Sequence, residues 1–124
     1  MPDDKPPKRK PGRPPFRTFH TTIGFHLTSA LHEAMKALAT ERGVNLEDVY
    51  REAALSFLER RGAGEATTYL AAPQARSATR VAVPMADELC ARLREAARSD
   101  HQSLGNVFET ATRLYLAALD LRDS

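Results

Sequence analysis

The segment from Thr21 to Leu58 recurs without a gap as the segment from Thr79 to Leu116. Apolar residues meet apolar residues at eleven positions of this alignment. In the first copy these are Ile23, Phe25, Leu27, Leu31, Met35, Leu46, Val49, Tyr50, Ala53, Phe57 and Leu58, and in the second they are Val81, Val83, Met85, Leu89, Leu93, Leu104, Val107, Phe108, Ala111, Tyr115 and Leu116. A constant offset of this kind is typical of a duplicated structural unit. The chain is therefore expected to contain the same fold unit twice.

A unit of about 40 residues is too short to bury an adequate hydrophobic core by itself. We expect the two copies to bury their apolar faces together in one pseudo-dimeric domain. The predicted boundaries are an arm over 1–17, a first unit over 18–61, a linker over 62–77 and a second unit over 78–124.

Cys90 is the single cysteine, which excludes an intrachain disulfide or a Cys-rich zinc site and favours a reducing compartment. No apolar run approaches the roughly 20 residues of a membrane span, and the N-terminus lacks the apolar region of a signal peptide. We expect a cytoplasmic protein without membrane partners.

The formal net charge of +2 is unevenly distributed. The arm over 1–17 holds six of the 18 Lys and Arg side chains and two of the 16 Asp and Glu side chains, so it carries +4. The remainder carries −2. Because six of the eight prolines also fall in this stretch, we predict a disordered or polyproline-like arm.

Alternating apolar residues predict two β-strands. From Phe19 to Leu27 one face holds the apolar positions, and the other holds His20, Thr22, Gly24 and His26. In the second copy Val81, Val83 and Met85 alternate with Arg80, Ala82 and Pro84. Pro84 has no N–H donor, so strand pairing is expected to end or fray there.

Each strand is followed by apolar residues at helical spacing. They are Leu31, Met35, Leu38 and Ala39 in the first copy and Leu89, Leu93, Ala96 and Ala97 in the second. Thr28 or Ser29 can cap the first of these helices, and Asp87 and Glu88 suit the positive end of the other.

A break in each copy precedes a further helix. Gly43 marks the break in the first copy, and Asp100 with His101 marks it in the second. Asn45 and Ser103 are good N-cap residues for the helices that follow. The predicted fold is mainly α, with strand, helix and helix repeated in one chain to give four helices and a two-stranded antiparallel ribbon.

The stretch from Thr79 through Leu89, continued by Arg92-Leu93-Arg94-Glu95, Ser103-Leu104 and Leu114-Tyr115-Leu116, resembles the ribbon-helix-helix family of Arc, MetJ and CopG. The resemblance implies that two strands pair into a ribbon that enters the DNA major groove, backed by four helices. The single-chain arrangement is similar to that of the accessory proteins that bind the transfer-enhancer site in T-DNA export.

In such a ribbon, residues outside the apolar alternation face the base edges. The resemblance implies base-reading roles for Thr22, Gly24, His26, Arg80 and Ala82. Arg80 can bind guanine O6 and N7 with two N–H groups, while glycine and alanine contribute only shape or apolar contact. Simple strand propensity for Thr22 and an exposed charge for Arg80 remain alternatives.

The second helix of each unit in this family presents its N-terminal amides to a DNA phosphate. The matching positions are Asn45 and Leu46 in the first copy and Ser103, Leu104 and Gly105 in the second. Glu47 and Asp48 place carboxylates where a phosphate would lie in the first copy. We therefore expect the second copy to bind phosphate more strongly.

The arm resembles an AT-hook, in which Gly-Arg-Pro lies in a narrow A·T minor groove. Its expected DNA-binding residues are Lys8, Arg9, Lys10, Gly12, Arg13 and Arg17. Nonspecific attraction to phosphates and a solubility or targeting role are the alternatives. Minor-groove binding or nonspecific attraction would each add salt-sensitive affinity.

The four histidines form no close chelating pair in the sequence, so no metal site and no cofactor are expected. No set of nucleophile, base and orienting group suggests an enzyme. We expect a sequence-selective binder of double-stranded DNA, acting as a transcriptional repressor or as an accessory factor in plasmid transfer or partition.

One chain would form a monomeric pseudo-dimer, compatible with higher oligomers on DNA and with regulatory or DNA-processing protein partners. Exchange of strands between chains remains open. The alternative function is an antitoxin-type protein-interaction module.

Overall fold

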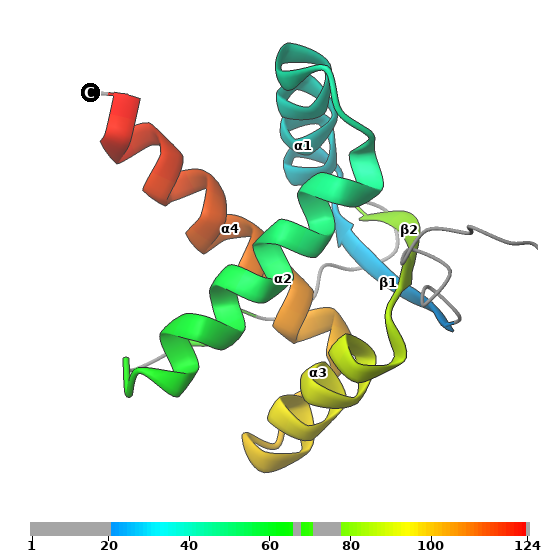
Figure 1. Ribbon diagram of the computed structural model, residues 1–124, viewed down its shortest axis with the longest axis vertical. Coiled ribbons are helices and arrows are strands. Elements are labelled where there is room, and N and C mark those ends of the chain that lie inside the picture. Colours follow the sequence, from blue (N-terminus) through cyan, green and yellow to red (C-terminus); the bar gives the residue numbers. More distant parts are fainter. Residues whose placement is uncertain (1–20, 66–67, 71–77, 124) are drawn as a thin grey trace, which may run out of the picture.

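A computed structural model of the chain describes residues 21–65, 68–70 and 78–123. It is mainly helical, with a two-stranded sheet (Figure 1). The elements are β1 (Thr21–Thr28), α1 (Ser29–Arg42), α2 (Leu46–Gly62), β2 (Ala78–Met85), α3 (Asp87–Ser99) and α4 (Leu104–Asp123). In the described part of the chain, no helix combines the length and the apolar character needed to cross a membrane.

The two strands pair antiparallel, and we call this pair the ribbon. Thr21 lies opposite Met85, Gly24 opposite Ala82, and Thr28 opposite Ala78. Gly24 and Ala82 are also equivalent positions of the sequence repeat, since the offset that relates Thr21 to Thr79 relates them too. Equivalent residues of the two copies therefore meet at the centre of the ribbon.

The inner face of the ribbon is buried, as the alternation predicted. Its side chains are between 0 and 5% exposed, and they are Ile23, Phe25, Leu27, Val81, Val83 and Met85. The helices cover this face and leave the other face of the ribbon uncovered (Figure 1). Because strand side chains alternate between two faces, this burial fixes which residues point outward.

Phe25 connects the ribbon to the two long helices. Its ring stacks on that of Phe108 of α4 with centroids 3.9 Å apart, and it meets the Tyr50 ring of α2 edge-on at 5.7 Å. Tyr50 and Phe108 are equivalent in the repeat, and both are fully buried. One aromatic ring of the first strand thus lies between matching rings of α2 and α4.

The turns that precede α2 and α4 share a left-handed residue and the same backbone hydrogen bond. Gly43 and His101 both have positive φ, 69° and 57°. The following amides, of Val44 and Gln102, donate to Ala39 and Ala97 carbonyls at 3.0 and 2.8 Å. This is the hydrogen-bonded turn that commonly ends a helix at a left-handed residue. The predicted breaks before α2 and α4 are confirmed. In the break before α4, His101 adopts a backbone conformation that favours glycine.

Two local expectations were wrong. Pairing does not end at Pro84, because β2 continues to Met85 and pairs with Thr21. A proline fits a strand whose outer edge has no neighbour, since no ladder donor is needed there. The side chain of Thr28 does not cap α1, because its hydroxyl donates instead to Glu109 of α4 at 2.6 Å.

Helix α2 ends at Gly62, one residue after the predicted end of the first unit. The arm over 1–17, the beginning of the first strand at Phe19 and most of the linker over 62–77 lie outside the described residues. Predictions that fall there stay predictions.

Candidate functional site

The outward side of the ribbon, which we call the outer face, has five exposed residues. They are Thr22, Gly24, His26, Arg80 and Ala82. The alternation assigned these five to this side together with Pro84 and His20, and His20 lies outside the described residues. Pro84 lies at the same side but is half-buried. The outer face is small and open, with polar groups at its ends and small residues at its centre.

Arg80 lies opposite His26 and extends toward Gly24. A Cβ built at Gly24 would clash with Nη2 of Arg80 and lie 3.1 Å from its Nε. Within the described residues, no hydrogen bond or ion pair engages this guanidinium. The absence of a side chain at residue 24 therefore gives the Arg80 guanidinium its place near the middle of the outer face.

Both ends of the ribbon are held by the long helices. Arg51 of α2 donates to the Pro84 carbonyl at 2.6 Å and pairs with Asp48 at 2.5 Å. Glu109 of α4 accepts from the Thr28 amide at 3.1 Å and from the Thr28 hydroxyl. Arg51 and Glu109 occupy equivalent positions of the repeat. Side chains of opposite charge therefore fasten the two strand ends.

The N-termini of α2 and α4 differ in chemistry. Asn45 precedes α2 without a side-chain cap, and Glu47 and Asp48 lie in the first turn. Ser103 precedes α4, and its Oγ accepts from the Asn106 amide at 3.1 Å. The first turn of α4 carries no acidic residue.

A helix leaves its first amides without an intrahelical acceptor. At α4 these belong to Leu104 and Gly105, which are half-buried, whereas at α2 the half-buried Leu46 is followed by two carboxylates. The Arg51 guanidinium balances one of these charges by pairing with Asp48. The positive end of the α4 dipole is not opposed by acidic groups in its own first turn.

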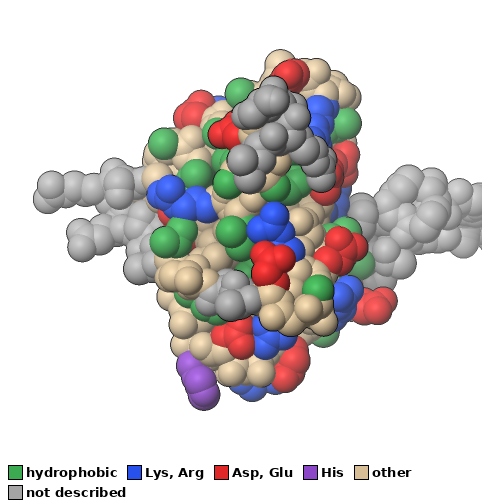
Figure 2. Space-filling view, turned by 90° about the vertical axis from the view of Figure 1, so that its left-hand side faces the viewer, with side chains coloured by type: hydrophobic (Ala, Val, Ile, Leu, Met, Phe, Trp, Pro, Cys, Tyr) green, Lys and Arg blue, Asp and Glu red, His purple; other side chains and the backbone are tan. Residues whose placement is uncertain are grey.

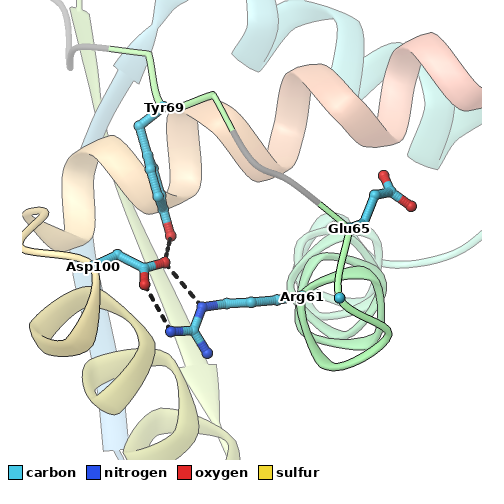
Figure 3. Close-up of a pocket in the computed structure, with 5 residues that line it drawn as sticks. Arg61, Glu65, Tyr69 and Asp100 are labelled. Carbon is cyan, nitrogen blue, oxygen red and sulfur yellow. Dashed lines mark hydrogen bonds and ion pairs between the residues drawn. The ribbon is translucent and has the colours of Figure 1, made fainter.

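A polar cluster that sequence reasoning missed joins α2, the segment after it and the turn before α4. Arg61 donates from Nε and Nη2 to the two Asp100 oxygens at 2.9 and 2.8 Å, and the Tyr69 hydroxyl also donates to Asp100. Figure 3 shows Arg61 and Tyr69 pointing at Asp100 from different sides, while Glu65 points away. No sequence spacing links these three residues.

The hydrogen bonds from Arg61 and then Tyr69 lower the pKa of Asp100 to about 2. Burial, followed by the bond to Asp100, raises the pKa of Tyr69 to about 12. The cluster borders an open pocket of about 540 Å³. Since Arg61, Tyr69 and Asp100 are already paired with one another, the cluster joins Tyr69 to α2 and to the turn before α4.

The side of the molecule away from the ribbon has mixed charge. Figure 2 shows this side, with basic and acidic side chains interspersed among apolar ones. Leu55 of α2 is 43% exposed and borders two grooves of about 460 and 490 Å³, one toward the start of α3 and the other toward α4. Among the described residues, the charged side chains on this side do not form a patch of one sign.

Comparison of the chain with protein-family models, with curated proteins and with solved structures gives no match.

No group of three or more His, Cys, Asp or Glu side chains able to hold a metal occurs within 21–65, 68–70 and 78–123. Nδ1 of His32 lies 2.7 Å from the Tyr50 hydroxyl. Burial and, to a smaller extent, Lys36 lower the pKa of His32.

The basic residues of the arm lie outside the described part, so their predicted role stays a prediction.

Proposed function

We propose that the chain is a tandem ribbon-helix-helix protein, a single-chain pseudo-dimer that binds double-stranded DNA through the outer face of its ribbon. The observation that carries this proposal is the strand register. Gly24 lies opposite Ala82, and the two are equivalent positions of the repeat. A two-fold axis relating the copies would pass between them, as it does between the strands of a symmetric dimer.

The helices support the same relation. α1 and α3 begin at Ser29 and Asp87, and α2 and α4 begin at Leu46 and Leu104, so both pairs keep the offset of the repeat. The left-handed residues Gly43 and His101 repeat with this offset too. Such agreement between sequence period, strand register and turn geometry favours duplication over a chance likeness of two amphipathic segments.

The outer face has the form that a major groove accepts. The groove admits a two-stranded β-ribbon, whose outward side chains then meet base edges. Arg80 supplies a guanidinium, Thr22 a hydroxyl and His26 an imidazole, while Gly24 and Ala82 keep the centre low. Few groups here can read bases, so modest sequence discrimination is expected, with phosphate contacts supplying much of the affinity.

The phosphate contacts are assigned to the first turn of α4, with Ser103, Leu104 and Gly105, and more weakly to Asn45 and Leu46 at α2. The arm adds its charge of +4 to a remainder that carries −2. Attraction between the arm and phosphates would make binding strongly dependent on salt. The proposed role is that of a repressor or an accessory factor in DNA transfer or partition.

The test is NMR mapping of the full chain with a short random-sequence duplex at low salt. Shifts are expected at the amides of Thr22, Gly24, His26, Arg80 and Ala82, with a further group around Ser103 to Gly105. Removal of the arm over 1–17 is expected to weaken binding but leave this pattern. Shifts that disappear with the arm, or that never include the outer face, would overturn the proposal.

A protein-interaction module, for example an antitoxin, is the second candidate. The exposed side chain of Leu55 and the grooves beside it favour this function. The two candidates use different surfaces, the outer face of the ribbon and the grooves beside Leu55. Leu55→Glu is expected to leave DNA binding unchanged, whereas loss of a co-purifying protein partner in this variant would favour the interaction module.

A further inference from the structure

The outer face is asymmetric at its centre, although the backbone around it repeats. Arg80 of β2 and Thr22 of β1 occupy equivalent positions. Only the arginine is long enough to reach the central pair, Gly24 and Ala82. The ribbon therefore has one cationic group where a symmetric ribbon would have two or none.

Gly24 determines where this group lies. Gly24 and Arg80 are diagonal neighbours across the two strands, and a long side chain can span the distance between such neighbours. The Arg80 guanidinium occupies the space that the Cβ of any other residue at position 24 would need. Ala82 holds the equivalent position in β2 but carries that Cβ. Of the two central positions, only Gly24 on β1 therefore leaves room for a guanidinium.

We propose that the Arg80 guanidinium, positioned over Gly24, is the single central base reader of the ribbon and selects one guanine in the middle of a non-palindromic site. This inference rests on the proposed function and adds the specificity-determining residue and its positioning residue. A guanidinium donates two parallel N–H groups that match guanine O6 and N7 in the major groove. With one such group near the two-fold axis, the preferred guanine would lie on one strand only, and the site would have a direction.

The experiment is a selection of bound duplexes from a random-sequence library with the full chain, followed by affinity measurements on the selected duplex. The wild type is expected to enrich a motif with one central guanine that is not matched by symmetry. For Arg80→Ala, the preference for that guanine is expected to fall by about 10-fold or more. Arg80→Lys is expected to keep most of the charge-dependent affinity but lose the guanine preference.

Gly24→Ala tests the positioning role, because the added methyl group displaces the guanidinium without changing its charge. The central guanine preference is expected to weaken or move by a base pair, with thermal unfolding little changed. Ala82→Gly is the matched control, since it exchanges the same two residues in the other strand and should keep the preference. The chemical shift of the Arg80 Nε–H group in the free protein should change in Gly24→Ala and not in Ala82→Gly.

The outcomes separate the two proposals. A wild type that enriches no sequence and does not bind duplexes overturns the proposed function, and this inference with it. A wild type that enriches a motif while Arg80→Ala and Gly24→Ala select the same central base overturns this inference alone. A palindromic motif with two equivalent guanines also contradicts it.

Discussion

The segments Thr21–Gly62 and Ala78–Asp123 have the same order of strand, helix and helix. The contacts that join the two segments, however, use side chains of opposite charge at equivalent positions. At one helix position the first has Arg51 and the second Glu109, and each holds an end of the other segment's strand. At the end of the first helix, Arg42 donates to the Tyr115 hydroxyl, whereas its equivalent Asp100 accepts from Arg61. The contacts that differ are contacts between the segments.

This difference favours pairing of unlike segments over pairing of like ones. Glu109 receives two hydrogen bonds from Thr28, one from the amide and one from the hydroxyl. The equivalent of Thr28 in the second segment is Ala86, which has no hydroxyl. If the second segment paired with a second copy of itself, Glu109 would be buried with one donor fewer, and burial of an under-bonded carboxylate is costly.

The largest expected effect is at Glu109, whose side chain is almost fully buried. Glu109→Ala removes charge-assisted hydrogen bonds and leaves the Thr28 amide without its acceptor, so we expect a loss of about 2 to 4 kcal/mol in the free energy of unfolding. Arg113→Ala is the control, because Arg113 is exposed and lies 3.8 Å from Glu109. Urea unfolding measures both. An equal, small effect of the two variants would contradict the role of Glu109 in holding the end of β1.

The next effect is at Asp100 and depends on pH. Because the pKa of Asp100 is about 2 in the folded chain and 3.8 ordinarily, its stabilisation is present above about pH 4 and is lost as the pH falls toward 2. Asp100→Asn should cost about 1 to 2 kcal/mol at neutral pH, a value reduced by the partial exposure of the ion pair to solvent. This cost should shrink between about pH 4 and 2. A constant difference across that range, in urea unfolding at each pH, would exclude the ion pair as its cause.

Substitutions in the two left-handed turns are expected to change the free energy of unfolding by smaller amounts and in opposite directions. His101→Gly should stabilise the chain by about 0.5 to 1 kcal/mol, since glycine adopts positive φ without steric cost. Gly43→Ala should destabilise it by about 1 kcal/mol for the same reason, as no neighbouring atom lies near the added methyl group. Thermal unfolding of both variants tests whether the two turns are equivalent. Changes of the same sign would contradict that.

The smallest effect is expected at Thr112, the equivalent of Ala54. Both side chains are fully buried, and the Thr112 hydroxyl has no hydrogen-bond partner among the residues described. Thr112→Val keeps the shape and removes the unpaired hydroxyl, so a gain of up to about 1 kcal/mol is expected. Ala54→Val is the comparison variant, because it adds volume to a filled position. Destabilisation by Thr112→Val, measured by thermal unfolding, would show that the hydroxyl is hydrogen-bonded in solution.

The sequence predicted the elements well because strong periodic signals mark them. Alternation identified the inner residues Ile23 and Val83 and the outer residues Thr22 and Arg80, since a strand has only two faces. Helix starts at Leu46 and Leu104 followed from the N-cap residues before them. The repeat supplied a second, independent reading of every element.

The side-chain contacts could not be predicted, because they depend on which elements meet in space. Thr28 looked like a helix cap, yet its hydroxyl has a stronger, charged acceptor in Glu109, which is far away in the sequence. Pro84 looked like the end of pairing, because the sequence does not tell which edge of the strand is free. The position of Arg80 over Gly24 likewise follows only from the register.

The central claim is that one chain supplies both strands of a DNA-binding ribbon. Sedimentation of the full chain on a duplex selected from the random library, combined with a footprint of that complex, tests it most directly. We expect one chain on each site, with a protected core that is not palindromic. Two chains sharing a palindromic core, one on each half, or no protection of the duplex, would contradict it.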